Sequence, residues 1–281
     1  LNPDGTKTGP DIRRFYQVMS ELPKSDTLEN DSMVLFTNLE GAAVSPSPGV
    51  ADPNAGSRYN GAKKEVIMHE GREHLSGAYR FGLEHETGAV EDDCKPADDD
   101  EVDFFSWNTL HEVGHAVDDK HKFMDSKGKG SDYGGWIVYG GNFTPIAEAI
   151  AKEFEYDKVY LVQRMSGNAN PALPAIPSGE KCTEEEWESR RLRAMGFLSV
   201  AAASNKPWRS ATSMERLKLG DRIYLESYGG YWTSYEAKAR SRAITGYQFR
   251  APGEWFSELY AAFHSGKLKE SHPSYGWLST L

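Results

Sequence analysis

The segment HEVGH at residues 111–115 constrains this chain more than any other feature of its sequence. Apolar residues around it recur at helical spacing, which predicts a helix that begins near Asp103 or Ser106 and passes Asp118. Residues four apart on a helix project from one face, so the two imidazoles of the segment lie side by side. Their nitrogens can share one metal ion, while Glu112, about 100° round the helix, lies beside that ion.

This segment has the HExxH pattern of zinc peptidases, in which the glutamate takes a proton from the attacking water molecule. The chain contains only eight histidines among 281 residues, so a chance match within a helical segment is rare. We therefore expect a zinc hydrolase in which His111 and His115 bind the metal and Glu112 is the general base.

A catalytic zinc ion needs a third protein ligand, and three residues are candidates. His121 follows His115 by six residues, as in the metzincin pattern HExxHxxGxxH, but Asp118 stands where that pattern has glycine. Glu254 and Glu258 are four apart on a predicted last helix and share a face. One of these carboxylates would bind the metal while the other orients a ligand imidazole. The residues alone leave the choice open.

The segment HEVGHAVDD at 111–119, taken with Tyr247, Glu254 and Glu258, resembles the anthrax lethal factor family of zinc endopeptidases, which includes Pro-Pro endopeptidases. The resemblance implies a gluzincin site in which His111, His115 and Glu254 bind zinc and Glu112 is the general base. It further implies that Tyr247 faces the oxyanion and that Glu258 and Asp118 surround the ligands, with His121 as the alternative ligand.

The same resemblance implies an α+β, zincin-like fold with an active-site helix and a small mixed sheet, whose strand beside the cleft corresponds to Val66–His69. We expect one catalytic domain over 1–281, with residues 122–246 as an insertion or substrate-recognition subdomain. The patterns predict helices over 11–22, 144–154, 183–203 and 252–265, strands over 33–36 and 65–68, a hairpin over 223–233, and loops over 42–61 and 168–181.

Composition excludes some classes of function. The net charge of −10 argues against a nucleic-acid partner. No apolar run is long enough to span a membrane, and no signal peptide is visible; the first residue, Leu1, favours an excised or processed domain. The acidic stretch 92–101 lacks calcium-loop spacing and is expected to be solvated. One bridge between Cys94 and Cys182 is compatible with the sequence.

We therefore expect a zinc endopeptidase acting on a protein or peptide. The resemblance suggests the catalytic domain of a toxin or effector, secreted or delivered into a target cell as part of a larger polypeptide or delivery system. Two alternatives remain: a zinc amidase acting on peptidoglycan or another non-protein amide, and a non-catalytic binding module on a protease scaffold.

Overall fold

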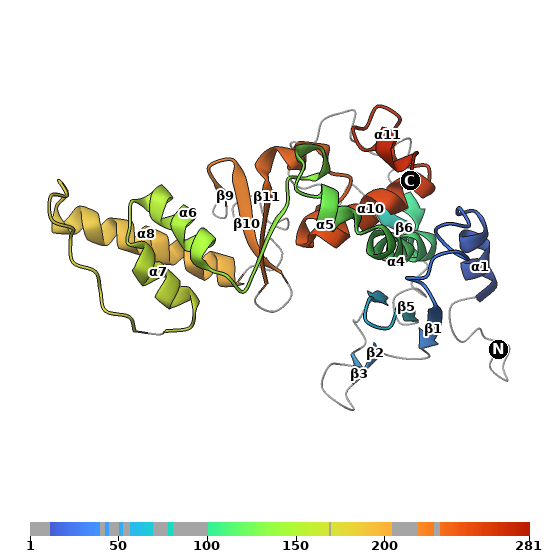
Figure 1. The fold of residues 1–281 in the computed structure, drawn as a ribbon, viewed down its shortest axis with the longest axis horizontal. Helices are drawn as coiled ribbons and strands as arrows, with labels where there is room; N and C mark the ends of the chain where they lie inside the picture. The colour runs from blue at the N-terminus through green and yellow to red at the C-terminus, as the bar shows by residue number, and fades with distance from the viewer. Residues whose placement is uncertain are drawn as a thin grey trace. The chain divides into compact units, whose positions relative to one another are not determined.

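The computed structural model describes residues 12–39, 43–44, 51–52, 57–69, 78–80, 101–168, 170–203, 218–227 and 231–281. Both helices and strands occur in these ranges, so the predicted α+β class is confirmed. The chain divides into two compact units, the first covering 1–128, 241–248 and 252–281 and the second 129–240 and 249–251 (Figure 1). That residues 122–246 are an insertion serving substrate recognition stays a prediction.

Helix α4 (Phe104–His121) is the longest described helix of the first unit, and local sequence explains both of its ends. Asp103 caps its start, because the Asp103 side chain accepts a hydrogen bond from the backbone N–H of Ser106 at 2.8 Å. Lys122 adopts a left-handed conformation (φ 50°) and ends the helix before α5 (Phe123–Lys127). The predicted helix is therefore confirmed, and it continues three residues beyond Asp118.

Helix α10 (Pro252–His264) packs along α4 (Figure 1). It begins with a proline, whose missing N–H costs nothing in the first turn, and Gly266 follows it with φ 71°. The two backbones approach closely, since a Cβ atom at Gly114 would lie 3.0 Å from the Cα atom of Ser257. The absence of a side chain at Gly114 thus lets α10 reach the face of α4 that carries the histidines.

A small mixed sheet in the first unit has the strand order β1 (Leu35–Leu39), β5 (Glu65–His69), β4 (Arg58–Asn60). Strand β1 is parallel to β5, and β4 is antiparallel to it. Helix α1 (Ile12–Ser20) supplies Phe15 to a core formed with Val66, Met68 and Phe105. This core joins the sheet to the start of α4.

The prediction of an uninterrupted loop over 42–61 was wrong, because β4 and the antiparallel pair β2 (Ala43–Val44) and β3 (Ala51–Asp52) lie within it. Strands of two or three residues are too short to show an alternating pattern, and pairing with a neighbour defines them. Strands β6 (Ala78–Arg80) and β7 (Glu101–Asp103) also form an antiparallel pair.

The second unit contains an antiparallel sheet with the order β8 (Ile137–Gly140), β11 (Tyr231–Glu236), β10 (Arg222–Ser227), β9 (Lys218–Leu219). Strands β10 and β11 are the predicted hairpin, although residues 228–230 lie outside the described ranges. The described helices of the second unit are α6 (Thr144–Phe154), α7 (Lys158–Met165) and α8 (Glu184–Ala203). A capping box precedes α8 as predicted: Glu186 accepts the backbone N–H of Thr183 at 2.7 Å, and Thr183 accepts that of Glu186 at 3.1 Å.

Short helical turns complete the described chain: η2 (Ser131–Tyr133), η4 (Ala237–Arg242), η5 (Gly246–Arg250) and α11 (Tyr275–Leu278).

Within the described ranges, no helix combines the length and the apolar character needed to cross a membrane. Residues 92–100 of the acidic stretch, which include Cys94, lie outside those ranges, so its solvation and the bridge between Cys94 and Cys182 stay predictions.

Candidate metal centre

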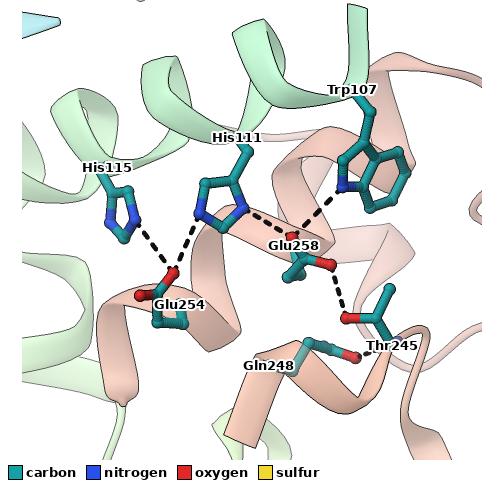
Figure 2. Close-up of polar contacts among 7 residues, drawn as sticks. All are labelled: Trp107, His111, His115, Thr245, Gln248, Glu254 and Glu258. Carbon is teal, nitrogen blue, oxygen red and sulfur yellow. Dashed lines mark hydrogen bonds and ion pairs between the residues drawn. The ribbon is translucent and has the colours of Figure 1, made fainter. Parts of the chain in front are cut away.

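Helices α4 and α10 bring together His111, His115 and Glu254, although 143 residues separate the first from the last. The two imidazoles lie on the face of α4 that looks toward α10 (Figure 2). Nε2 of His111 lies 3.0 Å from Oε2 of Glu254, and Nε2 of His115 lies 3.3 Å from the same oxygen. One ligand atom from each residue falls within 4.8 Å of the other two, so this group could hold a metal ion.

The three side chains of this group are mostly buried, but one of them is partly exposed to solvent. The side chains of His111 and Glu254 are 7% and 8% exposed, whereas that of His115 is 22% exposed. A metal ion held here would therefore be largely removed from bulk water, with access on the His115 side.

Burial alone would lower the pKa of His111, but its contacts with Glu254 and Glu258 raise that pKa well above the ordinary value of 6.5. Burial would likewise raise the pKa of Glu254, but hydrogen bonds from His111 and His115 hold it well below its usual range. The carboxylate of Glu254 is thus ionised and is paired with a protonated His111. A metal ion bound here would take the place of the proton on Nε2 of His111.

Glu258 holds the far side of the His111 ring (Figure 2). Its Oε1 lies 2.7 Å from Nδ1 of His111 and accepts a hydrogen bond from Nε1 of Trp107 at 3.3 Å. Its Oε2 accepts a hydrogen bond from Oγ1 of Thr245 at 2.5 Å. A carboxylate in this position keeps the ring proton on Nδ1 and leaves Nε2 free to bind a metal.

Glu112 is 3% exposed, and its Oε2 has no hydrogen-bond partner among the described residues. Burial raises the pKa of this carboxyl group, while the charges of His111 and His115 lower it. The backbone N–H of Tyr59, on β4, also hydrogen-bonds the carboxylate and lowers its pKa. Glu112 is therefore a desolvated carboxylate next to the candidate metal ligands, with an oxygen available for a further proton.

Tyr247 lies in the turn that precedes α10, and its ring centroid is 5.6 Å from that of His111, with the planes at 74°. The side chain is half-buried. The structure therefore places the predicted tyrosine beside His111.

Of the two other predicted residues, His121 lies apart from the group, whereas Asp118 is close enough to His115 to interact with its charge. His121 is exposed at the last position of α4 and does not belong to the group, because the helix continues past Asp118 instead of turning there. Asp118 accepts a hydrogen bond from the backbone N–H of Met124 at 2.8 Å, and among the described residues no hydrogen bond joins it to His115. Burial raises the pKa of Asp118 to about 6.

Sequence reasoning missed three residues around Glu258. Trp107 precedes His111 by four residues, so helical spacing could have placed it on the same face. Thr245 and Gln248 gave no comparable signal, because their contacts arise from the fold of a turn. Oε1 of Gln248 accepts hydrogen bonds from the backbone N–H groups of Ile244 and Thr245, at 2.6 and 3.0 Å.

No match to this chain emerged from a scan against models of protein families or from searches of curated proteins and solved structures.

Proposed function

We propose that this protein is a zinc-dependent endopeptidase with a zincin-like catalytic unit, as its resemblance to the lethal factor family implies. The observation that carries the proposal is the group formed by His111, His115 and Glu254, with the desolvated carboxylate of Glu112 beside it. Two imidazole nitrogens and one carboxylate oxygen are the ligands of many catalytic zinc sites, which keep a further position open. The mixed sheet packed against α4 is compatible with that fold.

A bound zinc ion would supply the Lewis acid that activates a water molecule and polarises the scissile carbonyl group. Glu112 then accepts the proton of the attacking water on its free Oε2 and delivers it to the leaving amine. Burial raises the pKa of Glu112, which suits a group that must both take and release a proton. Tyr247 donates its phenolic hydrogen to the oxygen that becomes negatively charged.

Substitution of Glu112 by Gln tests this assignment, because Gln keeps the shape of the side chain but cannot accept the proton. We expect the E112Q variant to retain zinc, measured by elemental analysis, and to lose roughly 10²–10⁴-fold or more of its cleavage rate on a peptide library. Unchanged cleavage by zinc-loaded E112Q would contradict the mechanism.

The substrate class is tested with the wild-type chain. Peptide-library cleavage, read by mass spectrometry, should reveal an endopeptidase, whereas release of products only from peptidoglycan fragments would favour the amidase alternative. A chain that retains no zinc after gentle purification would favour the non-catalytic module. Action as a toxin or effector delivered into a target cell rests on the family resemblance alone.

A further inference from the structure

The turn between η4 and α10 contains two side chains that are completely buried, Thr245 and Gln248. The amide oxygen of Gln248 accepts a hydrogen bond from the backbone N–H of Thr245 (Figure 2) and another from that of Ile244. Two hydrogen bonds from consecutive backbone N–H groups to one side-chain oxygen hold the turn closed. The backbone of Thr245 is thereby fixed next to the first half of α10.

Thr245 uses its hydroxyl group to hold Glu258. Its Oγ1 donates to Oε2 of Glu258 at 2.5 Å, while Oε1 of the same carboxylate contacts the rings of Trp107 and His111. Both carboxylate oxygens thus have donors on opposite sides, and rotation of the carboxylate would break a hydrogen bond on each side. At 3% exposure no bulk water replaces a lost partner.

We propose that Thr245, held in place by Gln248, is a positioning residue for the metal site. By fixing the carboxylate of Glu258, it keeps the proton of His111 on Nδ1 and aims Nε2 toward Glu254. Tyr247 belongs to the same turn, so the clamp formed by Thr245 and Gln248 also sets where that phenol stands relative to the His111 ring. This inference rests on the proposed zinc site, but it concerns the geometry of ligand binding and not the choice of substrate.

A role of Thr245 in packing alone predicts a different outcome from a role in positioning Glu258. Valine has nearly the shape of threonine, so T245V would be almost silent if only packing mattered. In the arrangement seen here, T245V leaves Oε2 of a buried carboxylate without its donor, and the freed carboxylate no longer fixes the imidazole.

The chain offers a matched control in Thr109 on α4. This threonine is also completely buried, but its Oγ1 has no hydrogen-bond partner among the described residues. T109V therefore removes a buried hydroxyl two residues from His111 without removing a hydrogen bond. The conservative variant T245S keeps the donor and loses only a methyl group.

The experiment measures zinc affinity by competition with a chromophoric chelator, and the visible absorption of the cobalt-substituted protein as a readout of ligand geometry. We expect T245V to weaken zinc binding about 10–100-fold, the usual effect of losing a partner of a ligand histidine, and to alter the cobalt spectrum. T245S should restore most of the affinity and the spectrum, and T109V should match the wild type. If T245V does not fold, comparison of T245A with T245S isolates the hydroxyl in the same way.

If T245V had the zinc affinity and the cobalt spectrum of the wild type, this inference alone would be overturned. The same conclusion would follow if T245S lost as much zinc affinity as T245V. A wild-type chain that binds no zinc would instead overturn the proposed function and the inference with it. Zinc binding without any peptide cleavage would leave the positioning role intact and reject the peptidase.

Discussion

Glu254 and His121 have contrasting surroundings, although both fit a third-ligand role from sequence. The side chain of Glu254 is 8% exposed and contacts the imidazoles of His111 and His115, whereas His121 is exposed at the end of α4. We expect E254A to weaken zinc binding by more than the roughly 10–100-fold typical of an outer partner, because a ligand itself is lost. H121A should bind zinc like the wild type in the same chelator competition. If H121A instead lost more zinc affinity than E254A, a metzincin-type site would be favoured.

His264, the last residue of α10, should make the stability of the first unit depend on pH. Burial lowers the pKa of its imidazole below 6.5, although the charge of Asp26 opposes this shift. The folded state therefore prefers the neutral ring, and the unfolded chain takes up a proton first as the pH falls. The free energy of unfolding should accordingly decrease below about pH 6.5 and stop decreasing, for this residue, below its folded pKa.

The H264Q variant isolates that contribution, because glutamine does not titrate. Urea unfolding of the zinc-free chain between about pH 5 and 8 should show a smaller loss of stability on acidification for H264Q than for the wild type. Parallel losses in the two proteins would show that His264 is not the titrating group.

The contact between α4 and α10 should be sensitive to any atom added at Gly114. A Cβ atom there would lie 3.0 Å from Cα of Ser257 and 3.2 Å from Cβ of Tyr260, so the helices would have to separate. We expect G114A to destabilise the first unit by about 1–3 kcal/mol and to weaken zinc binding, since Glu254 moves with α10. Thermal unfolding and chelator competition measure the two effects.

Gly196, in the middle of α8, provides the control for that substitution. It is exposed, and a Cβ atom at this position would meet nothing within 4 Å. G196A should therefore stabilise its helix by roughly 0.5–1 kcal/mol, the ordinary gain of alanine over glycine. If G114A had the same effect as G196A, the close approach of α4 and α10 would not set the ligand spacing.

Sequence patterns predicted the helices because their causes are local. The apolar spacing of α4, the cap at Asp103 and the capping box at Thr183 each involve residues a few positions apart. Whether His121 could reach the metal site depends instead on whether the chain turns at Asp118. Because α4 continues, His121 lies about 240° round the helix from His115 and points away from the site.

The missed features are those that leave no periodic pattern in the sequence. Strand β4 exists because β5 pairs with it, and its three residues carry no pattern of their own. The clamp of Thr245 and Gln248 depends on a turn whose hydrogen bonds gave no periodic signal. The sequence could therefore name the residues nearest the candidate ion, but not the contacts that hold them.

At the scale of the whole molecule, a bound zinc ion would act as a cross-link between α4 and α10. All three candidate ligands belong to the first unit. Binding to the folded state alone adds about 2.7 kcal/mol of stability when the free ion exceeds its dissociation constant a hundredfold. Removal of zinc by a chelator should therefore increase backbone hydrogen exchange in α4 and α10.

Helices α6 and α8 of the second unit contribute no ligand, so their exchange should not change when zinc is removed. The E254A chain is the control, because a protein that already lacks the ligand should respond little to the chelator in any helix. Equal acceleration in α4, α10, α6 and α8 would show that the ion stabilises both units together. Acceleration confined to the first unit would instead show that the metal links two helices whose sequences are separated by the whole second unit.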